Sequence, residues 1–247
     1  MSSTEPLSLA TLEWGRTGPR ALLIHGITSS ARGWWRLGAE MARAGYAVTA
    51  PDLRGHGDSP RGQDYLLRSY AADVLALGDE WDVVVGHSLG GAIALVAQNE
   101  NRAFAGRLLL EDPALTLSNP DRILNEYTRV FEDPSAATIL AENPRWHPQD
   151  ARIKAEALEA SSPDVVRHTF LDNERWDLVP LAKELDRPTL LLAAEPDQGA
   201  LVRKETGEMI AAANPRVTFR VLAGSGHSMH RDSYDEFWRE LQALLSQ

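Results

Sequence analysis

The sequence predicts an α/β fold, with a mainly parallel central sheet that carries helices on both faces and an inserted helical cap. Short apolar runs alternate with helical segments along most of the 247 residues, which is typical of parallel sheets covered on both sides. After Pro113 the pattern becomes largely helical, and the alternation resumes at Pro188. We therefore expect residues 1–113 and 184–247 to form the core. Residues 114–183 would form a cap over the carboxyl ends of the strands, where such sheets bind ligands.

The elements of the first half follow from apolar runs and their stop signals. Apolar or β-branched runs predict strands, and apolar residues at helical spacing predict helices. A glycine marks the end of the first helix. We expect strands at residues 7–14, 21–24 and 47–50, and helices at 30–44 and 70–77.

The second half repeats the alternation on either side of the cap. Residues 82–85 and 107–110 predict two buried strands, with a small, apolar helix starting near Gly91 between them. Beyond the cap we expect strands at 188–193 and 217–222 and helices at 201–213 and 233–245.

Ser88 lies between two glycines at the junction of a predicted strand and a predicted helix. The stretch Gly86-His87-Ser88-Leu89-Gly90 directly follows the apolar run at 82–85. A strand that turns at once into a helix strains its pivot residue, and only small neighbours fit around that pivot. The turn would lift the serine hydroxyl over a helix N-terminus, where developing negative charge is favoured. This pattern predicts a nucleophile elbow.

Composition limits the possible partners. The formal net charge of −10 argues against nucleic acid and anionic membranes, because both require a basic face. The chain has no cysteine, which excludes disulfides and thiolate chemistry. We see neither a secretory signal nor a run of the ~18 apolar residues that would span a bilayer. We expect a cytoplasmic protein with a small-molecule substrate, as a monomer or a homodimer.

Four motifs together resemble the α/β-hydrolase superfamily. They are His25-Gly26, the segment 52–59 (Asp-Leu-Arg-Gly-His-Gly-Asp-Ser), the glycine-flanked serine segment 86–91, and Gly224-Ser225-Gly226-His227. The resemblance extends over nearly the whole chain and is weaker through the cap. It implies the α/β-hydrolase fold and points to a cap-bearing serine esterase or lactonase, in which nucleophile, acid and histidine occur in that chain order.

In that family pattern Ser88 is the nucleophile and His227 the base. A serine hydroxyl needs a base at neutral pH, and His227 follows the last predicted strand in a flexible Gly-Ser-Gly-His loop. His230 is read as a pocket-rim or surface residue. The two histidines lack the carboxylate spacing of a zinc site, and no nucleotide-binding glycine motif is present, so we expect neither metal nor cofactor.

The third triad member would fix the imidazole tautomer and stabilise the imidazolium. Asp197 follows the predicted strand at 188–193, where the superfamily usually places its acid, and it is the predicted acid. Glu195, in the same loop, is a nearby alternative. Glu111 and Asp112 are further alternatives, because some superfamily members take the acid from the end of an earlier strand.

The resemblance also implies an oxyanion hole made of two backbone N–H groups. One would come from Leu89 after the nucleophile and the other from Ile27, in the loop after the strand at 21–24. His25 and the segment 52–59 are expected to be structural, with their polar groups bonding buried backbone.

Large aromatic side chains are the candidates for the substrate pocket. Pockets are mostly apolar with few polar groups, and the candidates are Trp34, Trp35, Phe131, Trp146 and Trp176. They would favour a medium-sized, largely apolar substrate. No cluster of arginines in the sequence predicts a clamp for a carboxylate.

The predicted function is hydrolysis of a carboxylic ester or lactone through an acyl-enzyme on Ser88, His227 and Asp197. Other acyl hydrolysis and carbon–carbon bond hydrolysis use the same triad, and the fold does not separate them. A lyase or a cofactor-free oxygenase or haloperoxidase is a further alternative. A hydroxynitrile lyase would need a cation near the serine, for which the cap residue Lys154 is a candidate. A ligand receptor that keeps the fold is the remaining alternative.

Overall fold

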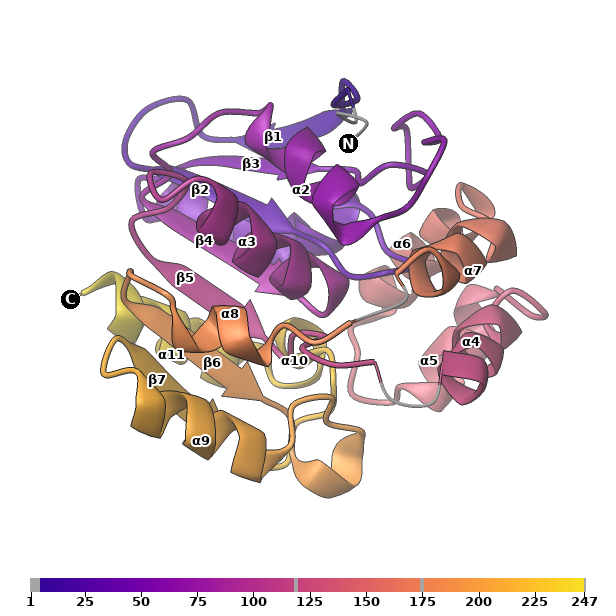
Figure 1. The fold of residues 1–247 in the computed structure, drawn as a ribbon. Helices are drawn as coiled ribbons and strands as arrows, with labels where there is room; N and C mark the ends of the chain where they lie inside the picture. Colours follow the sequence, from indigo (N-terminus) through magenta and orange to yellow (C-terminus); the bar gives the residue numbers. More distant parts are fainter. Residues whose placement is uncertain (1–4, 118–119, 174–175, 247) are drawn as a thin grey trace.

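The computed structural model describes residues 5–117, 120–173 and 176–246. Its centre is one seven-stranded sheet with the strand order β1-β3-β2-β4-β5-β6-β7 (Figure 1). β1 pairs antiparallel with β3, and all the remaining neighbouring pairs are parallel. The predicted fold class is thereby confirmed.

The strands lie close to the predicted runs. They are β1 (Thr11–Trp14), β2 (Arg20–Ile24), β3 (Ala47–Pro51), β4 (Val83–His87), β5 (Leu108–Glu111), β6 (Thr189–Ala193) and β7 (Val217–Val221). β4, β5 and β6 are buried along their whole length, because helices cover both faces of a parallel sheet. The first strand begins later than predicted, at Thr11.

Helices of the core lie between these strands, and the last two helices lie after β7. They are α1 (Trp35–Arg43), α2 (Leu67–Leu75), α3 (Leu89–Glu100), α9 (Lys204–Ala213), α10 (Met229–Asp232) and α11 (Tyr234–Leu245), with short 3-10 turns η1 (Ala31–Trp34) and η2 (Pro196–Gln198). The helix predicted at 30–44 is thus split into η1 and α1.

Alternation along the strands divides the core into two apolar layers. Leu22, Ile24 and Val84 point to the layer that α2, α3 and α9 cover, whereas Leu23 and Val85 point to the layer that α1 and α11 cover. Successive strand residues face opposite sides of a sheet, so β2, β4, β5 and β6 each supply both layers.

Among the described residues, five helices lie between β5 and β6, in the segment predicted to be the cap. They are α4 (Pro120–Arg129), α5 (Ala136–Glu142), α6 (Pro148–Glu159), α7 (Pro163–Leu171) and α8 (Val179–Lys183). α4 to α7 gather beside the sheet in Figure 1, while α8 packs against α3 and α9 of the core. α8 thus packs on core helices, although it lies within the segment 114–183 that the sequence predicted to be the cap.

Helix α6 is attached to the segment that follows β2. The Trp35 indole N–H donates to Asp150 at 2.8 Å, and Arg32 forms an ion pair with Glu156 at 2.8 Å. Both acceptors lie on α6.

Within the described residues, no helix is long and apolar enough to cross a membrane.

Candidate active site

Ser88 occupies a strained turn between β4 and α3. Its backbone angles are φ 53° and ψ −115°, outside the regions that non-glycine residues normally occupy. A Cβ on Gly86 would lie 2.6 Å from the Gly90 carbonyl oxygen, and one on Gly90 would lie 2.2 Å from the Ile24 carbonyl oxygen. The turn therefore requires glycine at both flanking positions, and α3 begins at the next residue, Leu89.

The loop after β2 packs directly on this turn. A Cβ on Gly26 would lie 2.8 Å from His87 Nδ1 and 3.1 Å from Ser88 Cβ, so only glycine allows the loop to come so close. The hydrogen bonds of the described residues include none from the N–H of Ile27 or Leu89. Both N–H groups predicted to form an oxyanion hole are thus unpaired donors in segments that adjoin Ser88.

His227 contacts Asp112 rather than the predicted Asp197. Its Nδ1 lies 2.7 Å from Asp112 Oδ2, and the Asp112 side chain is fully buried. Asp112 Oδ2 also accepts the N–H of Leu201 at 2.9 Å, and Oδ1 accepts the N–H of Val202 at 3.0 Å. These three bonds hold the Asp112 carboxylate against His227. The contact uses Nδ1 of the imidazole ring and does not involve Nε2.

Asp197 lies in η2 and is exposed. Its loop does reach the histidine loop, but through Glu195, whose carboxylate accepts the N–H of Gly224 at 3.1 Å. The structure therefore does not bring Asp197 to His227. Asp112, one of the alternatives from the sequence, follows β5, the direct neighbour of β4, the strand that leads into Ser88.

A second histidine–carboxylate pair lies beside the first. Glu111 accepts bonds from the backbone N–H and the Nδ1 of His230, both at 2.9 Å. Both side chains are buried, and the Trp34 ring lies against the His230 ring with centroids 4.4 Å apart. His230 is thus a buried structural residue, not the rim or surface residue that the sequence predicted.

His87 joins the two pairs. Its Nε2 lies 3.1 Å from the His227 carbonyl oxygen, and burial lowers its pKa well below the usual value, so it is neutral and donates to that oxygen. His87, Glu111 and His230 place potential metal ligands within 4.8 Å of one another. The 2.9 Å contacts between Glu111 and His230 are direct hydrogen bonds, so the carboxylate and this imidazole bind each other directly.

The segment 52–59 shapes the loop after β2. Asp52 accepts the N–H of Ala31 at 2.7 Å. His56 Nε2 accepts the N–H of Thr28 at 3.3 Å. Burial lowers the pKa of His56 to about 3, which keeps it neutral and able to accept. His25 Nε2 likewise accepts a backbone N–H, from Leu53 at 3.0 Å.

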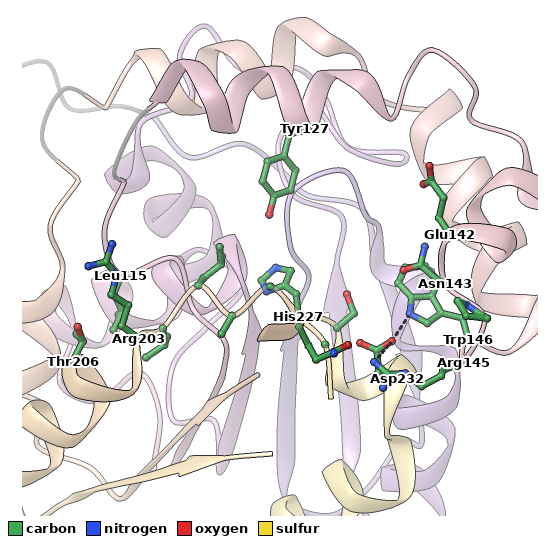
Figure 2. Close-up of a pocket in the computed structure, with 18 of the residues that line it drawn as sticks. Leu115, Tyr127, Glu142, Asn143, Arg145, Trp146, Arg203, Thr206, His227 and Asp232 are labelled. Carbon is green, nitrogen blue, oxygen red and sulfur yellow. Dashed lines mark hydrogen bonds and ion pairs between the residues drawn. The ribbon is translucent and has the colours of Figure 1, made fainter. Parts of the chain in front are cut away.

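A pocket of about 1090 Å³ opens between the cap and His227. Figure 2 shows Tyr127 on α4 pointing down toward His227, with Trp146 at the side of the pocket. The lining also carries charged residues of both signs, among them Arg145 and Asp232. The pocket is therefore more polar than the apolar cavity that the aromatic residues predicted.

Of the five predicted pocket aromatics, only Trp146 lines this pocket. Trp34 is 1% exposed and belongs to the core, and Trp35 bonds to the cap through Asp150.

Phe131 packs in the cap cluster that contains Trp146, and Trp176 donates to the Ala114 carbonyl oxygen at 2.6 Å. These side chains hold the cap to the core, which is the usual role of large apolar residues at such a junction. Tyr127 was missed because helical spacing alone does not show which side of a cap helix faces the site.

Comparison with known proteins agrees with this geometry. Residues 21–240 match the model described as the alpha/beta hydrolase family. Lipase LipV of Mycobacterium tuberculosis is 37% identical over 45% of this chain and 44% of its own length, so the match spans less than half of that lipase. N-formylmaleamate deformylase of Pseudomonas putida is 25% identical over 92% of this chain and 88% of its own.

Solved structures agree over most of the chain. An N-formylmaleamic acid deformylase from Pseudomonas putida has a TM-score of 0.80 and 25% identity, covering 94% of each chain. A thermophilic esterase from Thermogutta terrifontis has a TM-score of 0.77 and 24% identity, covering 96% of this chain and 93% of its own. The second similarity concerns the fold alone.

Proposed function

Because the chain belongs to the alpha/beta hydrolase family, we propose that it is a serine hydrolase that cleaves a carboxylic ester or lactone with Ser88, His227 and Asp112. The observation that carries this proposal is the 2.7 Å bond between His227 Nδ1 and Asp112 Oδ2 beside the strained Ser88 turn. A buried carboxylate on one ring nitrogen leaves the other to act as a base.

In the proposed reaction, His227 Nε2 takes the proton of the Ser88 hydroxyl as its oxygen attacks the substrate carbonyl. The N–H groups of Ile27 and Leu89 stabilise the oxyanion, and the Asp112 carboxylate stabilises the imidazolium. Collapse of the intermediate returns the proton to the leaving alcohol and forms an acyl-enzyme. A water activated by His227 then releases the acid and restores Ser88.

The relatives support the reaction type more than the substrate. Their names include a lipase and a deformylase, so an ester and a formyl amide are both reasonable substrate classes. Near-identical machinery runs different reactions in one fold. The pocket of about 1090 Å³ admits a medium-sized substrate, and its charged lining accommodates polar groups as well as an acyl chain.

The test is hydrolysis of p-nitrophenyl esters of increasing chain length, a set of lactones and an N-formyl amide by the wild type and Ser88→Ala. Covalent labelling with a fluorophosphonate probe runs in parallel. We expect turnover and labelling that both disappear in Ser88→Ala. Turnover that persists in this variant, or a folded wild type that is neither active nor labelled, would refute the proposal.

A further inference from the structure

Lys154 is a cap residue that reaches the loop after β2. It lies on α6, and its Nζ donates to the Thr28 carbonyl oxygen at 2.6 Å and to Thr28 Oγ1 at 2.5 Å. Thr28 directly follows Ile27, one of the two proposed oxyanion donors. A lysine ammonium has three N–H donors, so one remains after both bonds to Thr28 are made.

The charge of Lys154 has no carboxylate beside it. Among the described residues, no Asp or Glu oxygen lies within 4.0 Å of Nζ, although ion pairs of arginine or lysine with a carboxylate form elsewhere. Burial lowers the pKa of Lys154 to about 7, and the charged group that lowers it further is Arg231. The Lys154 side chain is half-buried, and a partly desolvated cation without a counter-ion is costly, so an anion that binds there would reduce that cost.

Arg231 is a second cation that contacts the loop after β2. It lies on α10, directly after the segment that carries His227, and its Nη2 donates to Ser29 Oγ at 3.1 Å. Its guanidinium stacks over the Trp146 ring at 4.6 Å. Its Nε is buried without a hydrogen-bond partner among the described residues. Trp146 lines the pocket, so this cation stands behind the pocket wall.

The negative charges around Arg231 are more distant. Asp150, Glu111 and Asp232 act on its pKa, but no oxygen of these carboxylates lies within ion-pair distance of the guanidinium in the described chain. Asp150 is bonded to Trp35, and Glu111 to His230. These carboxylates therefore act on Arg231 at long range, whereas no carboxylate acts on Lys154.

We propose that Lys154, with Arg231 behind it, binds a carboxylate of the substrate, so that the substrate is an ester, lactone or amide with an anionic group a few bonds from the scissile carbonyl. The short spacing follows because Lys154 is bonded to the residue next to Ile27, whose N–H would hold the carbonyl oxygen. This inference rests on the proposed function, since Ser88 must be the nucleophile for the spacing to apply. Charge-assisted hydrogen bonds are the strong ones, which makes this contact a determinant of specificity.

The first experiment compares two methyl esters of equal length. Monomethyl succinate carries a carboxylate where methyl butyrate carries a methyl group, and proton release follows the hydrolysis of both. We expect the wild type to have the higher kcat/KM for monomethyl succinate. Lys154→Met should lower the ratio of the two kcat/KM values about 10- to 100-fold, the factor that one charge-assisted hydrogen bond supplies.

Lys204→Met is the matched control. It makes the same chemical change on an exposed lysine of α9 whose ion-pair partner is Glu208, at 3.8 Å, and the ratio should stay at the wild-type value. A ratio that is unchanged in Lys154→Met, or that falls equally in both variants, overturns the carboxylate site.

A binding experiment separates this inference from the proposed function. The melting temperature of the wild type and of Ser88→Ala is measured with succinate and with the neutral succinamide. We expect stabilisation by succinate alone in both proteins, with no stabilisation of Lys154→Met. Equal effects of the two compounds would overturn the inference even if esters are hydrolysed. Succinate-specific stabilisation without any Ser88-dependent turnover would keep the site and refute the proposed function.

Discussion

Replacing Asp112 by asparagine tests the assignment of the acid most directly. The Asp112 carboxylate accepts three hydrogen bonds, from His227 Nδ1 and the Leu201 N–H at Oδ2 and from the Val202 N–H at Oδ1. Asparagine has one oxygen and one NH₂ group. In either amide orientation, the NH₂ group faces at least one of these three donors.

Two losses follow from that mismatch. Turnover should fall about 10³- to 10⁴-fold, because His227 is no longer held in the tautomer that accepts the Ser88 proton. The free energy of unfolding should fall by about 1–3 kcal/mol, because a buried donor loses its acceptor. Steady-state kinetics on a p-nitrophenyl ester measures the first, and urea unfolding measures the second.

Asp197→Asn is the matched control, since it makes the same chemical change at an exposed residue of η2. It should keep wild-type turnover and change the free energy of unfolding by less than about 0.5 kcal/mol. If Asp197→Asn loses turnover while folded Asp112→Asn keeps it, our reasoning from the His227 contact is wrong.

Three further predictions concern the framework of the site. Gly90→Ala places a Cβ 2.2 Å from a backbone oxygen of β2. This variant should lose ester hydrolysis, and its free energy of unfolding should fall by about 1–3 kcal/mol. Wild-type activity in this variant would contradict the geometry of the Ser88 turn. Arg54→Met leaves the buried Asp73 carboxylate, 2.7 Å from Arg54 Nε, without its cation, so urea unfolding should show a loss of about 3–5 kcal/mol. Burial lowers the pKa of His25 to about 4 and of His56 to about 3. As the pH falls, these histidines bind protons in the unfolded chain before they do so in the folded protein, so urea curves should show the free energy of unfolding decreasing from about pH 6.5 toward pH 4. A free energy of unfolding that does not change over this range would contradict neutral buried histidines.

The sheet could be predicted because each core strand is a short apolar run with a clear boundary. β4, for example, begins with a run of valines and leads directly into the glycine-flanked Ser88. Alternating strands and helices then leave few topologies. The cap was less accessible, because its helices carry no such signal: α8 follows the cap helices in sequence but packs on α3 and α9.

The site was predictable where local sequence determines local geometry and unpredictable where the sheet brings distant residues together. The glycines around Ser88 impose their turn within a few residues. Asp112 and Asp197 both follow a strand, so sequence position favours neither. The order of strands in the sheet separates them, because β5 is the neighbour of β4 whereas β6 lies one strand further away. Lys154 and Arg231 meet at one loop only after the cap folds onto the core, so no sequence pattern indicated a cationic cluster.

Backbone strain gives an argument for Asp112 that does not depend on the His227 contact. In the described part of the chain, four non-glycine residues have positive φ: Thr28 (58°), Glu80 (57°), Ser88 (53°) and Asp112 (38°). Such a conformation costs about 1–3 kcal/mol and persists only where its surroundings enforce it, most often at functional sites. Three of the four lie at the proposed site: Thr28 next to the proposed oxyanion donor Ile27, Ser88 as the proposed nucleophile and Asp112 as the proposed acid. Asp197 has no such strain, since the positive φ of its segment falls on Gly199, where it costs little. The chain thus maintains strained backbone at Asp112 and none at Asp197, as expected if Asp112 is the residue whose carboxylate must be held in one place.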